Sequence, residues 1–419
     1  MFCCWQTPEA ECPLDRERQY PWDHHYSPYR KDYAKLAHNL YTKYLARHSG
    51  FSRNTVVSPL CAEIALLMLH AGADDKAKKE IAELLGVDPL DLTERLCSDQ
   101  SNLKMTEDED CDPDHPYGKN ENFRLYLANA ILLSEGTDCA QEFEKLNINS
   151  DLLPLTVTTD KESVTAFIRE HTLGHAHDVG LSRCAPQYPT LISTLHLRSN
   201  WYRPFKGERT FKMQFVTPDG RRVEVDAIHG IRKIPCWVPE GMGGAKFLQM
   251  LFEEDGSWSA LFVMPGAARQ TWRGPTKPQT MSELINLLTP ARLAGAIRQM
   301  LFHKVNEVTV QIPKFFVERN VEMQDILCEM GVRTPLKCGS DQPGSNVNSI
   351  MQHIRFGIDE RGVGNALPEK TTRPILDTME ICAVWHAEFV ANNPFIFLVY
   401  HHFTGHIAYM GHIADPAAI

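Results

Sequence analysis

The stretch PFIFLVYHHFTGHIAYMGHIADP, from Pro394 to Pro416, decides the fold. It consists of two apolar runs that are separated by the short segment Phe403-Thr404-Gly405. Runs rich in aromatic and β-branched residues favour strands, and a short connection that contains glycine is typical of a hairpin. The sequence therefore predicts a pair of antiparallel strands here, apolar enough to be buried.

Further apolar runs upstream predict more strands. Three of them have the length and composition of buried strands. They are LYLANAILLS (residues 125–134), TLISTLHL (residues 190–197) and SALFVMPG (residues 259–266). A fourth run, NEVTVQIPKFF, alternates instead, with Val308, Val310 and Ile312 on one face of the predicted strand.

The first part of the chain has the spacing of helices. From Tyr33 onward, apolar residues recur every three or four positions, which is the spacing of one helical face. Ser58 and the proline after it form a favoured start for a helix in SPLCAEIALLMLHAGA. Gly86 ends the helix predicted in DDKAKKEIAELLGV, and Gly331 ends the one predicted in NVEMQDILCEMGV. Helices come first and long strands dominate later, so the predicted fold class is α+β.

The pattern also bears on domain organisation. Residues 1–30 carry Pro, Cys, His and Tyr without periodicity, which predicts an irregular N-terminal arm. No internal repeat and no Pro/Ser/Gly-rich linker divides the residues that follow. We therefore expect a single domain over residues 31–419.

Composition excludes several classes of partner. The chain has 419 residues and a formal net charge of -10, and residues 107–114 form the acidic run EDEDCDPD. Nucleic acids and anionic membranes both require a basic surface, so neither is expected as a partner. No segment approaches the about 20 apolar residues that a membrane helix needs. The start of the chain lacks the order of a signal peptide and no N-glycosylation motif occurs, which favours an intracellular location and leaves a secreted one open.

Motifs for catalysis and for metal binding are absent from the sequence. It has no Gly-x-Ser-x-Gly elbow, no His-Glu-x-x-His helix and no phosphate-binding glycine loop, so we expect neither an enzyme nor a cofactor. The twelve cysteines lack paired metal-ligand spacing. His401, His402 and His406 lie close in sequence, but a hairpin scatters such rings, so no metal site is predicted.

Several motifs, in their order and spacing, resemble the serpins over about residues 33–416. The resemblance rests on NTVVSPL (54–60), SNWYRPF (199–205), VQIPKFFVERNVEMQDILCEMGV (310–332), IDERGV (358–363) and NNPFIFLVYHHFTGHIAYMGHIADP (392–416). It implies a large central, mostly antiparallel sheet of five strands, two smaller sheets and about eight or nine helices. It also implies an exposed reactive-centre loop, which a protease cleaves and which then inserts into the large sheet as a new middle strand.

The segment FGIDERGVGNALPEKTTRPIL (356–376) occupies the position of that loop. Glu360 and Gly362 match the hinge glutamate and glycine of the family. Inhibitory members then usually carry Thr or Ser followed by a run of Ala. This chain departs from that pattern with Val363, Gly364, Asn365, Ala366, Leu367 and Pro368.

Insertion would bury every second side chain of this loop beneath the sheet. The buried set would be Val363, Asn365, Leu367, Glu369, Thr371 and Arg373. Val and Leu suit such a position, whereas an unpaired amide or charge loses hydration at a cost of several kcal/mol for a charge. Pro368 and Pro374 also lack the N–H that a central strand must donate. The loop therefore begins like an inserting strand and then becomes unsuited to insertion.

Other positions that matter for parting the sheet differ as well. The family's sheet-opening cluster corresponds here to Ser58, Cys61, Ser193 and Gln352, where inhibitory members carry a second Ser, an Asn and a His at the last three positions. Trp201, in contrast, keeps the tryptophan found in the family at the top of the sheet, the region called the breach. Compared with inhibitory serpins, this chain keeps the residues that support the fold and changes those that help the sheet to open.

Two functions follow from the resemblance. The first is a non-inhibitory serpin, monomeric, whose loop is a protease substrate or a binding segment for another protein. The second is a working suicide inhibitor of a serine protease that tolerates an unusual loop. The cleaved bond would be Leu376–Asp377 if residues are counted forward from the hinge, or Ala383–Val384 if they are counted back from Pro394.

Overall fold

The structure is a computed structural model. It describes residues 30–48, 50–71, 73–86, 124–133, 154–176, 179–181, 189–202, 204–205, 211–252, 258–268, 270–271, 274–300, 302–336, 347, 349–364 and 387–418. The predicted arm, apart from Arg30, and the acidic run at 107–114 lie outside these ranges, and so do both predicted cleavage sites.

Seven helices lie within the described ranges. They are α1 (Arg30–Arg47), α2 (Pro59–Ala71), α3 (Asp75–Leu85), α6 (Lys161–His171), α7 (Met281–Leu287), α8 (Pro290–Met300) and α9 (Gln324–Glu329). Caps explain where two of the predicted helices begin or end. The Ser58 hydroxyl accepts from the Cys61 N–H at 3.0 Å at the start of α2, and Gly86 ends α3 in the left-handed region at a φ of 72°. No helix in this part of the chain is long and apolar enough to cross a membrane.

One predicted helix is shorter than expected. The helix predicted in NVEMQDILCEMGV is confirmed only over α9, because Asn320, Val321 and Glu322 belong to a strand instead. These three residues pair with the neighbouring strand, and ladder hydrogen bonds satisfy their backbone. Tertiary pairing therefore overrides the local helical spacing at this point.

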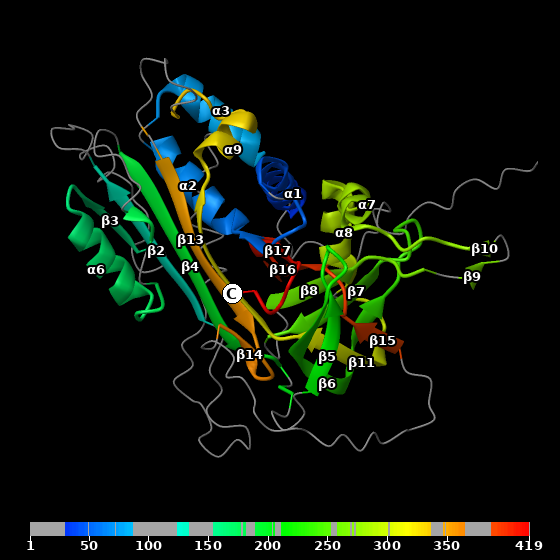
Figure 1. The fold of residues 1–419 in the computed structure, drawn as a ribbon. Coiled ribbons are helices and arrows are strands. Elements are labelled where there is room, and N and C mark those ends of the chain that lie inside the picture. Colours follow the sequence, from blue (N-terminus) through cyan, green and yellow to red (C-terminus); the bar gives the residue numbers. More distant parts are fainter. Residues whose placement is uncertain are drawn as a thin grey trace, which may run out of the picture.

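The six-stranded sheet lies at the left of Figure 1, and we call it the large sheet because it matches the large central sheet expected from the resemblance. Its order is β12 (Phe315–Glu322), β13 (Ser349–Ile358), β14 (Gly362–Val363), β4 (Thr190–Asn200), β2 (Arg124–Leu132) and β3 (Leu155–Thr158). Among the described residues, four of its pairings are antiparallel and two, β13 with β4 and β2 with β3, are parallel. This confirms the predicted large, mostly antiparallel sheet, which has six strands in place of the expected five because β14 enters it.

The second sheet contains the predicted hairpin. Its nine strands are β1 (Thr55–Val57), β5 (Phe211–Val216), β6 (Arg222–Trp237), β7 (Lys246–Leu251), β8 (Trp258–Met264), β11 (Val305–Pro313), β15 (Ala387–Val390), β16 (Phe395–His401) and β17 (Ile407–Ile413). The antiparallel pairing of β16 with β17 confirms the hairpin. The long strand β6 pairs with β5 and β11 and then, at its end, with β7, so the two smaller sheets of the expectation are joined by hydrogen bonds. A separate ribbon pairs β9 (Gln270–Thr271) with β10 (Gly274–Pro275).

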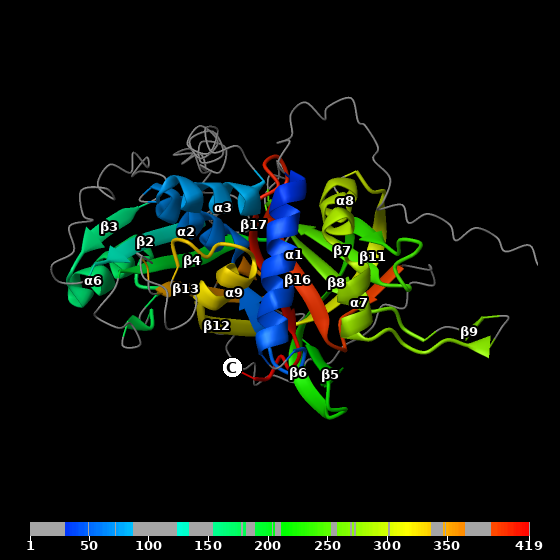
Figure 2. The same ribbon diagram turned by 90° about the horizontal axis from the view of Figure 1, so that it is seen from above.

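The helices cover these sheets on defined faces. α6 packs on the outer face of the six-stranded sheet through a small cluster that includes Val164, Ile168 and Ile192. Seen from above, α1 crosses the middle of the molecule between the two sheets (Figure 2). The main hydrophobic cluster lies beneath α1 and α2 and takes side chains from both sheets.

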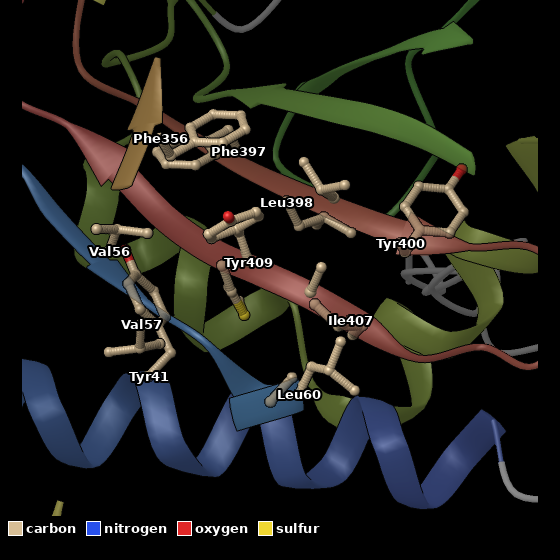
Figure 3. Close-up of a cluster of buried hydrophobic side chains, with 14 of the residues drawn as sticks. Tyr41, Val56, Val57, Leu60, Phe356, Phe397, Leu398, Tyr400, Ile407 and Tyr409 are labelled. Carbon is tan, nitrogen blue, oxygen red and sulfur yellow. The ribbon is translucent and has the colours of Figure 1, made fainter. Parts of the chain in front are cut away.

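The hairpin lies at the centre of that cluster. Phe356 stacks on Phe397, with 4.9 Å between ring centroids, and Tyr409 lies on the same strand as Ile407 (Figure 3). β17 also pairs with β1 near the other end of the described chain, with Thr55 opposite His412. The Tyr41 hydroxyl hydrogen-bonds the His412 Nδ1 at 2.8 Å, and burial lowers the pKa of His412 to about 4.

Candidate functional site at the fork of the large sheet

The candidate site lies where β13 and β4 separate, a place we call the fork. Below the fork the two strands pair directly and in parallel, from Ser349 opposite Thr190 to Arg355 opposite His196. At the other end of these strands, which we call the upper end although Figure 1 draws it lowest, the short strand β14 enters between them, with Val363 opposite both Ser199 and Ile358. The hinge that sequence reasoning identified is thus already a strand of the sheet as far as Val363.

A tight turn leads the chain into the fork. The Asp359 carboxylate accepts from the backbone N–H of Arg361 at 2.8 Å and of Gly362 at 2.9 Å. The Asp359 N–H in turn donates to the Gly362 carbonyl at 2.9 Å. This side chain therefore satisfies the donors that the turn would otherwise leave open.

Glycine is required on both sides of Val363. A Cβ atom at Gly362 would overlap the carbonyl oxygen of Ser199, and one at Gly364 would overlap that of Leu197. Gly364 also has a φ of 74°, in the region that favours glycine. Val363 itself is fully buried in the main cluster. The backbone of β14 thus fits between β4 and β13 only because Gly362 and Gly364 have no side chains.

Trp201 holds the turn from the side of β4. Its backbone N–H donates to the Arg361 carbonyl at 2.7 Å, and its indole Nε1–H donates to the Asp359 carbonyl at 2.9 Å. The ring stacks on Phe252 and is almost fully buried. The tryptophan that the sequence placed at the top of the sheet therefore contacts the hinge directly.

A buried ion pair ties the hinge to Lys314, the residue between β11 and β12. The Lys314 Nζ lies 3.0 Å from the Glu360 Oε1, with side-chain exposures of 6% and 11%. The Glu360 carbonyl also accepts from the Phe205 N–H at 2.8 Å. Sequence reasoning identified Glu360 but not Lys314; the available signal was a lysine inside the apolar run IPKFF.

The sheet-opening cluster lies below the fork on the core side. Gln352 binds the backbone of Ser58 twice, because its Oε1 accepts from the Ser58 N–H at 3.2 Å and its Nε2 donates to the Ser58 carbonyl at 2.9 Å. Ser193 is the register partner of Gln352 and donates from its hydroxyl to Asn129 Oδ1 at 2.9 Å. Asn129 was missed, although an asparagine inside the apolar run LYLANAILLS is a signal for such a role. The cluster is neutral and held by pairs of hydrogen bonds.

Cys61 completes the cluster without reactive chemistry. Its backbone N–H donates to the Ser58 hydroxyl, and its side chain is fully buried. Burial raises the pKa of the Cys61 thiol to about 12, so the reactive thiolate is not formed near neutral pH.

Several predicted positions lie outside the described residues. These are Asn365, Ala366, Leu367, Pro368, Glu369, Thr371, Arg373, Pro374, Leu376, Asp377, Ala383 and Val384.

The three histidines near the hairpin turn have separate partners. His401 contacts Thr404, His402 contacts Ser259, and His406 contacts Glu63. Within the described ranges, no group of three or more His, Cys, Asp or Glu side chains is placed to hold a metal ion.

Known proteins match this fold and these motifs over most of the chain. The family model described as "Serpin (serine protease inhibitor)" matches residues 31–416. Serpin I2 of Homo sapiens is 21% identical over 399 residues, covering 91% of this chain and 90% of that protein. Neuroserpin of Gallus gallus is 24% identical over 408 residues, covering 92% and 91%.

Solved structures agree in fold. A complex of thyroxine-binding globulin with thyroxine gives a TM-score of 0.69 at 19% identity, covering 92% of this chain and 99% of that one. The thermophilic serpin Tengpin in its native state gives 0.68 at 17% identity, covering 96% of each chain. The expected fold is confirmed. The chain belongs to the serpin family of protease inhibitors, and it is not an enzyme.

Proposed function

We propose that this protein is a non-inhibitory serpin. Its loop after β14 is cleaved as a simple substrate by a serine protease, or it binds another protein, and it does not insert further into the large sheet. The observation that carries this proposal is the register of β14 between β13 and β4. If the loop inserted further in the same register, the neighbours of each loop residue in the sheet would be fixed.

The first misfit in that register is Asn365. Continued insertion would place it between Leu197 and Phe356. Phe356 stacks on Phe397 and also contacts Tyr409, with 4.9 Å between ring centroids in each case. An amide buried against these rings without a partner costs about 1–3 kcal/mol.

The second misfit is Glu369. The same register places it between Ser193 and Gln352, the two strand positions of the sheet-opening cluster. Both of these side chains are neutral and already bonded, to Asn129 and to Ser58. A carboxylate buried there lacks a cation among these partners, and its desolvation costs several kcal/mol. Pro368, one residue earlier, removes a ladder donor from what would be a central strand.

A second function, suicide inhibition by loop insertion, is favoured by β14 itself. The large sheet already accepts Gly362 and Val363 between β13 and β4, so its upper end is open to the hinge. The two functions differ in what happens beyond Gly364.

The deciding experiment compares melting temperatures before and after the loop is cut with a nonspecific protease. A serpin whose loop inserts gains a full strand and becomes much more heat-resistant, whereas this protein should change by only a few degrees. A rise of tens of degrees, or an SDS-resistant complex with chymotrypsin or elastase, would establish the inhibitor instead.

A loop variant makes the experiment specific. Replacing Asn365, Leu367, Pro368 and Glu369 by Ala removes the amide and the charge and restores one N–H, so cutting should now raise the melting temperature measurably. We expect partial recovery only, because the cluster of Cys61, Ser193 and Gln352 is unchanged. The matched control replaces Lys370 and Thr372, which alternate with the buried set, and should behave like the unmodified protein.

A further inference from the structure

Four side chains form a row across the outer face of the large sheet at the level of the fork. Tyr126 of β2, His196 of β4, Arg355 of β13 and Glu318 of β12 are successive cross-strand partners. Side chains on adjacent positions of a strand point to opposite faces. Leu195 and Leu197 enter the main core, so His196 points to the face that α6 covers.

This row marks the last direct pair of the two central strands. His196 and Arg355 are the uppermost residues of β4 and β13 that pair with each other before β14 intervenes. Any widening of the fork must therefore separate this pair first.

The turn after α6, Thr172–Ala176, lies over the pair and contacts both strands. Arg355 Nη1 donates to the His175 carbonyl oxygen at 2.8 Å. The His175 ring lies 4.2 Å from the His196 ring, and the Tyr126 ring lies 5.8 Å from His196 and 6.0 Å from His175, so the three rings form one cluster. We call Thr172–Ala176 the cover turn, since it is bonded to β13 and packed on β4.

The cover turn is anchored at one end and strained in its middle. The Thr172 hydroxyl donates to the Ile168 carbonyl at 2.7 Å and accepts from the Ala176 N–H at 3.2 Å. Leu173, in contrast, has a φ of 48° and is 63% exposed. A residue with a Cβ in this region costs about 1–2 kcal/mol, and this leucine buries little surface in return.

The charges around His196 are mainly positive. Arg355 faces it from β13, Arg198 from its own strand and His175 from the cover turn, whereas Glu318 lies beyond Arg355 and bonds His353 at 3.1 Å. His196 is 1% exposed. Burial first, and then these three neighbours, lower the pKa of His196 to about 3. With the cover turn in place, the ring is therefore neutral.

We propose that the cover turn is an acid-released clamp on the fork, and that proton uptake by His196 on lifting of the turn favours the lifted state in mild acid. Lifting exposes the imidazole to water, breaks the Arg355–His175 bond and moves His175 away. The released imidazole then regains its ordinary affinity for a proton. The proposal concerns the local opening of the turn and does not depend on whether the loop inhibits a protease.

The size of the effect follows from linkage. His196 has a lowered pKa with the turn in place and an ordinary one of about 6.5 when lifted, so the closed state loses stability as the pH falls below 6.5. Between pH 7.5 and pH 5 the ratio of lifted to closed molecules should rise about 30-fold, and the slope approaches tenfold per pH unit below pH 6. This result depends little on the closed-state pKa as long as that pKa lies below about 4.

Hydrogen–deuterium exchange tests the proposal on the full chain. Peptides that cover residues 172–176 and 190–196 are followed at pH 7.5, 6 and 5, and rates are corrected for the intrinsic pH dependence of exchange. We expect protection in the 172–176 peptide to fall about 30-fold from pH 7.5 to pH 5, whereas the 190–196 peptide, whose residues pair with β2 and β13, should change less. A peptide from α3 (Asp75–Leu85) serves as the internal reference and should change little.

Two variants identify the group responsible. His196→Gln should reduce the pH effect to less than about threefold, because the ring that binds the proton is gone. His48→Gln, on an exposed histidine at the end of α1, is the matched control and should keep the full effect. If the glutamine variant fails to fold, His196→Phe preserves the stack on Tyr126 and is measured instead.

Arg355→Met tests the other half of the clamp, since it should raise exchange of residues 172–176 at pH 7.5 without acid. Exchange in the unmodified protein that is independent of pH between 7.5 and 5 would overturn the proposal. So would a 30-fold pH effect that persists in both His196 variants, or normal protection in Arg355→Met.

Discussion

The upper and the lower end of the boundary between β13 and β4 differ in what fills them. At the upper end, from Gly362 to Gly364, a third backbone lies between the strands, and glycines leave room for it. At the lower end the two strands pair directly, and this segment includes Ser193 and Gln352, whose side chains are hydrogen-bonded on the core side. Whether β13 and β4 pair directly or admit a third strand between them therefore depends on the side chains at that level of the sheet.

The two ends are also held by different forces. A buried ion pair and an indole hydrogen bond hold the upper end, whereas neutral hydrogen bonds hold the lower end. Removing one member of a buried ion pair is far more disruptive than removing one neutral hydrogen bond. Substitutions at the two ends should therefore differ in size.

The largest effect is expected at the ion pair. Glu360→Ala leaves the Lys314 ammonium buried without its carboxylate, so the free energy of unfolding should fall by about 3–5 kcal/mol. Urea denaturation measures the change. The double variant Lys314→Met with Glu360→Leu removes both charges and should recover most of the loss. Equal losses in the single and double variants would show that the unpaired charge is not the cause.

A smaller loss is expected when the upper end is blocked. Gly362→Ala places a Cβ on the Ser199 carbonyl, which should displace β14 and expose Val363, with a loss of about 2–3 kcal/mol. Trp201 fluorescence should shift to longer wavelength, because its hydrogen bonds to the turn are broken.

Gly220→Ala is the matched control for the blocked upper end. Gly220 has a φ of 83° and open space around it, so only the backbone penalty of about 1 kcal/mol applies, with no change in Trp201 emission. A spectral shift in this control, or an unchanged spectrum in Gly362→Ala, would contradict the displacement of β14.

The lower end should respond more weakly to the loss of its hydrogen bonds. Gln352→Leu leaves the buried Ser58 N–H without its acceptor, and we expect a loss of about 1–2 kcal/mol in the free energy of unfolding. Gln214→Leu, on the exposed face of β5, is the control and should stay within about 0.5 kcal/mol of the unmodified protein. If Gln352→Leu lowered the free energy of unfolding as much as Glu360→Ala does, the two ends would not differ in the strength of the interactions that hold them.

The smallest effect concerns the cover turn above the lower end. Leu173→Asn places a residue that tolerates the left-handed region at a φ of 48°, and stability should rise by about 0.5 kcal/mol. Thermal denaturation measures the gain. Leu173→Ala keeps the Cβ and the strain, and it should show no gain. Equal stability of the two variants would mean that the turn is not strained at this residue.

Local signals were sufficient for the hairpin and for the capped helices, whereas the hinge was assigned from the family resemblance. Ser58, Gly86 and Gly405 act within a few residues of their own positions, so the pattern around them is enough. Asn320 shows the limit, because a helical spacing was overridden by pairing with a distant strand.

The partners within the site were missed for the same reason. The Trp201 indole and the Asp359 carbonyl are separated by 158 positions, and Ser193 and Asn129 by 64. Sequence periodicity tells which face of a strand is buried but not which strand lies beside it. His196 was concealed in this way, since TLISTLHL has the composition of an ordinary buried strand.

The contacts of β17 with α1 and β1 set the order of events during synthesis. Tyr41 and His412 touch although 371 positions separate them, and a ribosome that adds about 5–20 residues per second needs about 20–70 s to make that stretch. Throughout this interval, the apolar faces of α1 and α2 exist without the strand that will cover them. The nascent chain therefore depends on chaperones or on transient collapse until the hairpin arrives, and mutations in β17 should reduce cellular yield more than they reduce the stability of the finished protein.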